Sequence, residues 1–229
     1  MQESSKKTTL KLLEKLKPGV ILDAPSGKGW LAERLSYGAI LDGVDLYESS
    51  SSALYRSHYQ FDLEEGLPEE LPLYDAVVCC EGIEHFGNPN LFFKAACRHL
   101  KPGGLLVVTT PNIWYPEARL QFLLRGFFPG FPCLAGRIER GSHMHITPWS
   151  FPQLYLYLTL NGFVEVDLHE EPLSRSKRWY EPLLGWPQKL YCRSKLRKAP
   201  SEELASFWKR AGSNPSVYGR HLIVSARKN

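Results

Sequence analysis

Residues 20–29 read VILDAPSGKG, and this stretch decides the fold. An apolar run ends in Asp23, and a loop carrying Gly27 and Gly29 follows before apolar residues return at helical spacing from Trp30. A buried strand, a tight loop and a helix are typical of an open α/β sheet, in which ligands bind at the carboxyl ends of the strands. The residues at strand ends are therefore the first candidates for a binding site.

The same strand-and-helix unit recurs along the chain. Apolar runs and turn residues predict strands at about 39–46, 59–63, 75–80, 105–110, 163–168 and 221–226, and helices at about 9–17, 30–35, 89–100, 150–160 and 202–211. Strands that alternate with helices indicate a mostly parallel sheet with helices on both faces. At 229 residues, we expect one decorated domain that spans residues 1–229.

The composition is that of a globular protein, with 43% hydrophobic and 23% charged residues. The longest uncharged stretch, 141–164, is interrupted by Pro148, Pro152 and Gly162, so it predicts no membrane-spanning helix. Five cysteines without a CxxC pair argue against a disulfide framework and against a zinc ribbon. These features predict a cytoplasmic, reducing location.

The formal net charge of +4 hides an asymmetry. Between residues 172 and 200, eight Lys and Arg residues accompany one Glu, so this segment carries +7 and the rest of the chain is acidic. It belongs to a basic insertion, 170–216, before the last predicted strand. Four interpretations stay open: a solvated face, a peripheral membrane patch that attracts anionic lipid, a protein contact, and a nucleic-acid contact, which we disfavour.

Three predicted strands end in a carboxylate: Asp23, Asp45 and Asp62. Asp45 lies about 20 residues beyond the loop, where a carboxylate accepts both hydroxyls of a ribose. Asp62 is placed to accept from an exocyclic amine, and Leu63 to lie against an adenine face. A phosphate loop relies on backbone N–H groups, and an acidic side chain at its start would repel the anion. The pattern predicts a nucleoside ligand with a positive amino group and without phosphate.

These and later motifs resemble the class I S-adenosylmethionine-dependent methyltransferases, in particular the small-molecule group that includes the ubiquinone-pathway O-methyltransferases. The glycine loop is followed, in that family's order and spacing, by GVDL at 43–46, FDL at 61–63, YDAVVCCEGIEH at 74–85 and LKPGGLLVVTTPN at 100–112. The resemblance continues more loosely over 145–166. It implies a Rossmann-like seven-stranded sheet with an antiparallel last strand, and S-adenosylmethionine as the cofactor.

The resemblance also implies which residues bind that cofactor. They are Asp23, Ala24, Gly27 and Gly29 at the methionine and ribose end, Asp45 and Leu46 at the ribose, Asp62 and Leu63 at the adenine, and Glu81 in the wall of the site. One departure is that Pro25-Ser26 stands where the family commonly has Gly-Cys, and Pro25 removes an N–H donor. A second interpretation of these aspartates is that they cap loops and helices locally.

His85 follows the fourth strand, where the resemblance places the methyl donor opposite the acceptor. A histidine has an ordinary pKa of about 6.5 and can take a proton from an attacking hydroxyl, so His85 is the predicted general base. The alternative is a structural histidine. Glu81, Glu84 and His85 also have the ligand chemistry of a divalent cation, at a spacing like that of the ubiquinone-pathway enzymes, but we expect no metal.

Residues 113–146 are rich in aromatic residues, Gly and Pro and are predicted to form a lid or substrate wall. Trp114 and Tyr115 at its start, and His143 and His145 at its end, are the candidate acceptor contacts. The alternative is that the aromatic residues belong to the ordinary core and the histidines to an ordinary loop.

The predicted function is methyl transfer from S-adenosylmethionine to a small-molecule, lipid-linked or glycan-linked acceptor, most readily to a hydroxyl oxygen. One alternative is a non-catalytic module that binds the same cofactor. Another is a nicotinamide-dependent dehydrogenase, which we disfavour because the loop reads DxPxGxG instead of GxGxxG.

Overall fold

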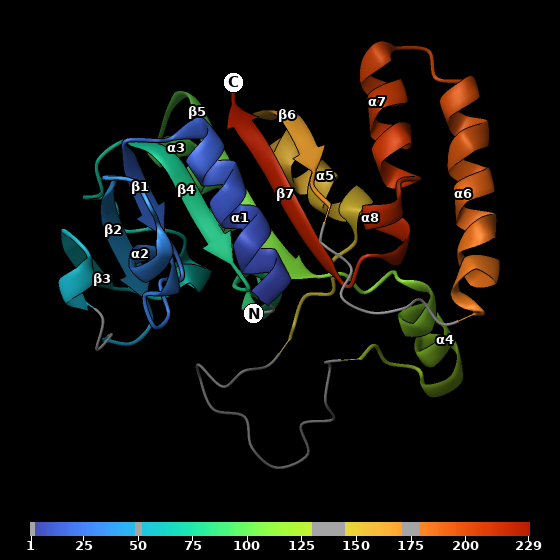
Figure 1. Ribbon diagram of the computed structural model, residues 1–229, viewed down its shortest axis with the longest axis horizontal. Helices are drawn as coiled ribbons and strands as arrows, with labels where there is room; N and C mark the ends of the chain where they lie inside the picture. Colours follow the sequence, from blue (N-terminus) through green and yellow to red (C-terminus); the bar gives the residue numbers. More distant parts are fainter. Residues whose placement is uncertain (1–2, 49–51, 130–144, 171–178) are drawn as a thin grey trace.

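The computed structural model describes residues 3–48, 52–129, 145–170 and 179–229. These residues form a seven-stranded sheet in the order β3-β2-β1-β4-β5-β7-β6 (Figure 1). Its strands are β1 (Val20–Asp23), β2 (Ile40–Asp45), β3 (Ser57–Gln60), β4 (Tyr74–Cys80), β5 (Leu100–Pro111), β6 (Phe163–Leu168) and β7 (His221–Lys228). The strand order reverses between β1 and β4, which is where an open α/β sheet binds its ligand.

The sheet is parallel except at one strand. β1 pairs in parallel with β2 and β4, and the parallel pairing extends to β3 and β5. β7 is antiparallel to both β5 and β6, so that His221 at its start pairs with Pro111 at the end of β5. The predicted fold class, a mostly parallel Rossmann-like sheet with an antiparallel last strand, is confirmed.

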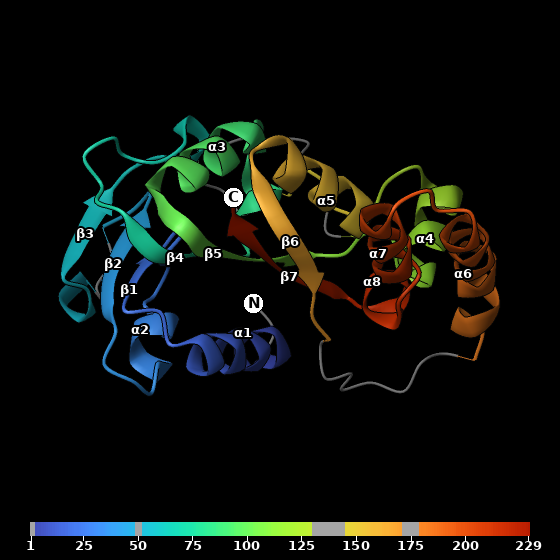
Figure 2. The same ribbon diagram turned by 90° about the horizontal axis from the view of Figure 1, so that it is seen from above.

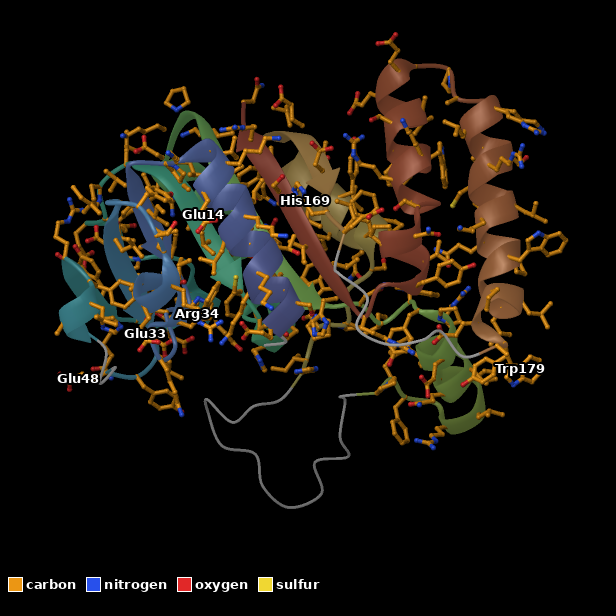
Figure 3. The ribbon with its side chains drawn as sticks, viewed as in Figure 1. Glu14, Glu33, Arg34, Glu48, His169 and Trp179 are labelled. Carbon is orange, nitrogen blue, oxygen red and sulfur yellow. The ribbon has the colours of Figure 1, made fainter. Side chains whose placement is uncertain are left out.

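Helices cover both faces of the sheet, as Figure 2 shows. The described helices are α1 (Glu3–Leu16), α2 (Trp30–Arg34), α3 (Pro89–His99), α4 (Pro116–Arg125), α5 (Phe151–Leu160), α6 (Glu181–Arg197), α7 (Glu202–Ala211) and α8 (Asn214–Tyr218), with short 3-10 turns η1 (Ser52–Leu54), η2 (Leu63–Glu65) and η3 (Ile83–His85). α1 and α2, which carry Glu14 and Arg34 (Figure 3), lie on one face, and α3 and α5 lie on the other.

Alternate strand residues supply the two cores. Leu22, Val77 and Val108 point toward the side of α3 and α5, whereas Ile21 and Val78 belong to the core under α1 and α2. All five side chains are fully buried. The two-residue period of a strand that is buried on both faces explains why the sequence shows near-continuous apolar runs.

Three predicted elements had a boundary that was wrong by three residues or more. β3 covers Ser57–Gln60 instead of 59–63, because Asp62 starts η2 by accepting a hydrogen bond from the backbone N–H of Glu64. β5 begins at Leu100, which pairs with Tyr74. α1 begins at Glu3 instead of residue 9, because its buried face also uses small polar residues that the leucine pattern does not reveal.

The two segments outside the sheet contain α4 and α6 to α8. The predicted lid, 113–146, contains α4, and its residues 130–144 lie outside the described residues. The basic insertion, 170–216, contains α6, α7 and the start of α8, which stand beyond the β6 edge of the sheet (Figure 2). No helix among the described residues is both long enough and apolar enough to cross a bilayer.

Candidate functional site

The loop after β1 is held to the two strands that flank β1. The backbone N–H of Ala24 donates to the carbonyl of Val78 in β4 (2.9 Å), and that of Ser26 donates to the carbonyl of Val44 in β2 (2.9 Å). Gly27 has a φ of 54°, a left-handed conformation that favours glycine, and a Cβ there would meet no described atom within 4 Å. The loop is therefore fixed at the carboxyl ends of the strands while its glycine end stays open to a ligand.

Asp23 is fully buried at the end of β1. Its Oδ2 accepts a hydrogen bond from the hydroxyl of Tyr55 (2.7 Å), whereas no described residue donates to Oδ1. Burial raises the pKa of the Asp23 carboxyl from 3.8 to about 7, the hydrogen bond from Tyr55 lowers it, and the charge of Asp45 raises it further. A buried acceptor oxygen without a protein donor is costly, and a cationic or N–H-bearing ligand would satisfy it.

Asp45 ends β2 and faces the same loop. Its Oδ2 accepts from the backbone N–H of Gly27 (2.8 Å), and its Oδ1 accepts from that of Tyr47 (3.2 Å). Leu46 follows it directly. Asp45 thus ties the β1 loop to the β2 end, as the local-cap interpretation expects, and each carboxylate oxygen retains acceptor capacity for a ribose hydroxyl.

Asp62 and Leu63 lie just beyond β3. Asp62 caps η2 through its hydrogen bond from the N–H of Glu64 (3.0 Å). Leu63 is 5% exposed and packs in the core on the α3 side. Their predicted contact with an adenine stays a prediction.

Glu81 and Gly82 shape the turn after β4. Glu81 has a φ of 52°, and its side chain accepts from the hydroxyl of Thr109 (3.1 Å) and lies 3.7 Å from Nε2 of His221. A Cβ on Gly82 would lie 2.5 Å from Cδ of Pro25, well inside van der Waals contact. Pro25, the departure from the family's common loop, is therefore accommodated by a glycine on the neighbouring strand end.

Glu84, His85 and His145 form a cluster beside this turn. Glu84 is buried, accepts from the hydroxyl of Thr110 (3.0 Å), and lies 3.9 Å from Nε2 of His85. The rings of His85 and His145 meet edge to face, with centroids 5.2 Å apart. Burial, and after it the charge of Glu81, raises the pKa of Glu84 to about 8, so near neutral pH it retains its proton in much of the population.

Backbone hydrogen bonds bring the distant His145 segment to this turn. The N–H groups of Ile146 and Thr147 both donate to the carbonyl of Glu84, at 2.7 and 3.0 Å. The indole N–H of the buried Trp149 donates to the carbonyl of Ile83 (3.1 Å). One carboxylate oxygen and two imidazole nitrogens thereby lie within 4.8 Å of one another, a set of ligand types that also suits a divalent cation.

The predicted acceptor contacts do not all lie together. Tyr115 stacks on Arg220, whose guanidinium carbon lies 3.8 Å from the ring centroid. Trp114 is 43% exposed on the segment that joins β5 to α4. His145 lies against His85, as described, and His143 lies outside the described residues.

Tyr55, Arg220 and His221 are site residues that the sequence analysis did not single out. Tyr55 follows η1, in a segment without a strong pattern. Arg220 directly precedes β7 and His221 begins it, and an antiparallel last strand brings its start to the carboxyl ends of its parallel neighbours. That topology was the available signal for the last two residues.

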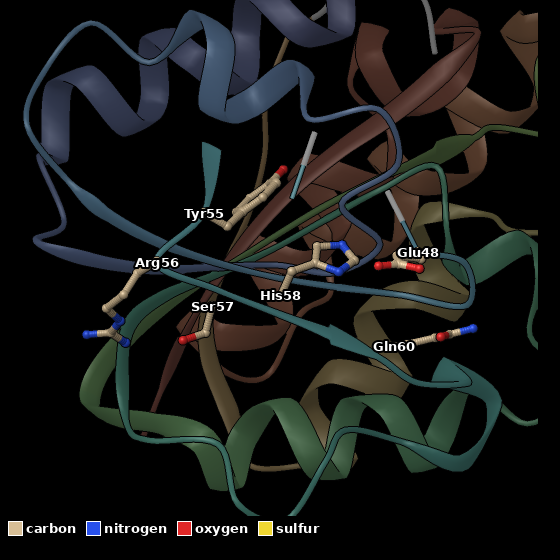
Figure 4. Close-up of a pocket in the computed structure, with 6 residues that line it drawn as sticks. All are labelled: Glu48, Tyr55, Arg56, Ser57, His58 and Gln60. Carbon is tan, nitrogen blue, oxygen red and sulfur yellow. The ribbon is translucent and has the colours of Figure 1, made fainter. Parts of the chain in front are cut away.

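An open pocket of about 430 Å³ lies on the β3 side of the loop (Figure 4). It is lined by Glu48, Tyr55, Arg56, Ser57, His58 and Gln60. His58 connects it to the loop, because its Nε2 lies 3.0 Å from Oγ of Ser26.

A family described as a methyltransferase domain matches residues 1–214 of the chain. The chain belongs to this methyltransferase family. The chain is 33% identical over 137 residues to the mitochondrial ubiquinone biosynthesis O-methyltransferase of Rattus norvegicus, and the match covers 54% of this chain and 38% of the rat protein. Against the Pseudomonas savastanoi pv. phaseolicola ubiquinone biosynthesis O-methyltransferase, the match is 33% over 136 residues, 54% of this chain and 55% of the relative. The chain thus spans 38% and 55% of the length of these two curated relatives.

Solved structures agree with the fold. A SAM-dependent methyltransferase from Archaeoglobus fulgidus superposes with a TM-score of 0.56 at 17% identity, over 97% of this chain and 94% of that chain. The 1,6-didemethyltoxoflavin-N1-methyltransferase of Burkholderia thailandensis, solved with S-adenosylhomocysteine, gives 0.56 at 15% identity, with coverages of 99% and 79%. A [4+2]-cyclase also matches, at 0.52 and 16% identity, with coverages of 96% and 80%. The resemblance to class I methyltransferases is confirmed, whereas the cyclase shows that this fold does not by itself specify the reaction.

Proposed function

We propose that this methyltransferase binds S-adenosylmethionine at the carboxyl ends of β1, β2 and β4 and transfers its methyl group to a hydroxyl oxygen of a small acceptor. The observation that carries the proposal is the buried Oδ1 of Asp23, which no described residue satisfies, beside a loop with an open glycine end. A positively charged ligand suits this place because the neighbouring strand end carries a second carboxylate, Asp45.

In this proposal, each cofactor-binding residue has a distinct task. Asp23 accepts from the amino group, Gly27 and Gly29 let the ligand approach the backbone, and Asp45 with Leu46 holds the ribose. Asp62 and Leu63 lie at the adenine, and Ala24 and Glu81 line the methionine side. The sulfonium supplies an activated methyl and a neutral leaving group, so the protein's contribution is to position the acceptor and exclude water.

His85 is proposed to accept the hydroxyl proton as the acceptor oxygen attacks the methyl carbon. Its side chain is 28% exposed, which leaves it accessible to an acceptor, and the neighbouring His145 restricts its orientation. The partly protonated Glu84 beneath it limits the negative charge near the attacking oxygen. Trp114 and Tyr115 would hold the acceptor from the β5 side.

The proposed acceptor is a small molecule, free or linked to a lipid or glycan, and the proposed location is the cytoplasm with peripheral contact at a membrane. Two curated relatives, the ubiquinone biosynthesis O-methyltransferases of rat and Pseudomonas, support oxygen as the methyl-accepting atom. The cluster of Glu84, His85 and His145 supports a second role for the same residues, the binding of a divalent cation.

Calorimetry and native mass spectrometry with S-adenosylmethionine and NAD test the proposal. We expect binding of S-adenosylmethionine and none of NAD, and then release of S-adenosylhomocysteine with a hydroxylated acceptor. Binding of NAD alone would contradict the assignment of the cofactor. Tight binding of S-adenosylmethionine without turnover on any hydroxylated or amino acceptor would favour the non-catalytic alternative.

A further inference from the structure

One side of α6 exposes large apolar side chains. Leu183, Trp186 and Leu190 are 67%, 60% and 42% exposed, and their spacing of three and four residues places them on one helix face. The opposite face contains Gly185 and Cys192, which are buried. α6 therefore packs through one face and presents an apolar stripe on the other.

Further exposed apolar side chains lie near the start of α6, just before the helix and on α4. Trp179, just before α6, is 86% exposed and lies at the end of the helix nearest α4 (Figure 3). α4 adjoins this end, because Arg119 donates a hydrogen bond to the carbonyl of Leu184 (3.1 Å). We group the exposed apolar residues of these adjoining segments under the name α4–α6 apolar face: Leu123, Leu124 and Phe127 in and just after α4, and Trp179, Leu183, Trp186 and Leu190 just before and in α6.

Cations border this face. Arg193 and Arg197 are exposed. They lie seven residues, or about two helical turns, beyond Trp186 and Leu190, so they extend the same stripe toward the end of α6. Arg125 ends α4. Between residues 179 and 200, the single acidic residue, Glu181, is buried and paired with Arg220, so it does not offset these charges at the surface.

Aromatic and aliphatic side chains next to Arg are typical of helices that lie in the interface of an anionic bilayer. We propose that the α4–α6 apolar face inserts into the headgroup region of an anionic membrane, with Arg193 and Arg197 on the lipid phosphates.

This face is tied to the acceptor side of the site. α4 lies toward the edge to which the parallel strands point (Figure 1). Arg220 pairs with Glu117 of α4 and Glu181 of α6 and stacks on Tyr115. Docking of the face therefore brings the acceptor side of the protein near the lipid surface. The inference rests on the membrane contact named under the proposed function and assigns the surface that makes it; it does not depend on which atom is methylated.

Vesicle flotation of the full chain tests it, with vesicles of phosphatidylcholine alone and with added phosphatidylglycerol, at low and high salt. We expect flotation with the anionic vesicles that weakens at high salt. Leu183→Glu/Trp186→Glu should reduce partitioning at least tenfold, and Arg193→Gln/Arg197→Gln should remove most of the preference for anionic lipid. The matched control is Leu160→Glu, at a 74% exposed leucine on α5, which should float like the wild type.

Calorimetry with S-adenosylmethionine verifies that each variant still folds and binds the cofactor, so a failure of docking is distinguishable from a failure of the proposed function. Leu123→Glu/Leu124→Glu on α4 provides a second pair should the α6 variant not fold. The proposal is overturned if wild-type protein stays in solution with anionic vesicles, or if both variant pairs float as well as Leu160→Glu. A second result would also overturn it. Ultracentrifugation would show that the wild type forms a dimer or a complex with another protein, and Leu183→Glu/Trp186→Glu would dissociate that assembly without reducing flotation.

Discussion

Arg220 and Glu181 form a largely buried ion pair, in which Nη2 of the guanidinium lies 2.6 Å from Oε1 of the carboxylate. The same nitrogen lies 3.2 Å from Oε2 of Glu117. One arginine at the start of β7 thus connects the first turns of α4 and α6, and its stacking on Tyr115 joins them to the proposed acceptor side. Arg220 is thus one of the residues that hold α4 and α6 to the sheet.

Removing Arg220 should destabilise the protein, because the nearly fully buried Glu181 would lose its partner. For Arg220→Gln, we expect a loss of about 2 kcal/mol in the free energy of unfolding, less than for a fully buried pair because Arg220 is 33% exposed. Urea denaturation measures it. The control is Arg34→Gln, whose pair with Glu3 is exposed and should contribute less than about 1 kcal/mol. Equal losses for both variants would contradict the proposed connecting role.

Asp45→Ala should weaken S-adenosylmethionine binding more than tenfold, because it removes both the proposed ribose acceptor and the hydrogen bond from Gly27 that shapes the loop. Calorimetry gives the dissociation constant. Asp167→Ala is the matched control. Asp167 is exposed and pairs with Arg210, and it lies in β6, at the edge of the sheet away from β1 and β2. An unchanged affinity in Asp45→Ala would refute the ribose assignment.

Asp23 should make stability fall as the pH rises. Its pKa is about 7 when folded and 3.8 otherwise, so between these values the folded chain holds a proton that the unfolded chain has released. The stabilisation is complete below about pH 4 and is lost as the pH rises through about 7. Asp23→Asn cannot ionise, so its stability should lack this dependence while its cofactor affinity falls. Urea unfolding at pH 5 and pH 8 gives the change in the free energy of unfolding between these pH values. An identical change in the wild type and in Asp23→Asn would exclude the raised pKa of Asp23.

His85→Ala should lower the rate of methyl transfer by roughly a hundredfold or more, the usual contribution of a general base. The rate of S-adenosylhomocysteine release with a hydroxylated acceptor measures the effect, and an unchanged rate in His85→Ala would exclude the base role. His169→Gln, on the β6 side, is the control for general loss of a histidine.

A chelator separates the two roles of the His85 cluster. With His85 as a base, wild-type turnover should persist in EDTA. Loss of turnover that Mn²⁺ or Zn²⁺ restores would instead assign Glu84, His85 and His145 to a cation site.

Gly82→Ala should destabilise the protein by about 2 kcal/mol or more, because the new Cβ would lie 2.5 Å from Cδ of Pro25. The same displacement of the loop should weaken cofactor binding. Pro25→Gly/Gly82→Ala should recover part of both losses, which thermal unfolding and calorimetry can measure. If the double variant loses as much stability and cofactor affinity as Gly82→Ala alone, Pro25 is not the reason that position 82 requires glycine.

The elements that could be predicted were those whose signal is local. The apolar runs that end in Asp23 and Asp45 identified β1 and β2 because a strand buried on both faces must be apolar throughout. The boundary near Asp62 could not be predicted, since the same residue suits a strand end and the cap that it forms on η2. α1 was underestimated because Ser5 and Thr9 are buried as completely as Leu13.

The sequence by itself determined the mostly parallel sheet, the glycine loop and the methyltransferase family, because strand periodicity, turn residues and short motifs are encoded by neighbours in the chain. Only the tertiary structure decided that Tyr55 bonds Asp23, that His145 meets His85 and that Arg220 joins α4 to α6. These partners are 32, 60 and 39 or more residues apart in the chain, so no local pattern specifies them. Chain topology brings them together, and in the case of Arg220 it does so through the antiparallel β7. Burial then gives their charges and hydrogen bonds the strength on which the proposed chemistry depends.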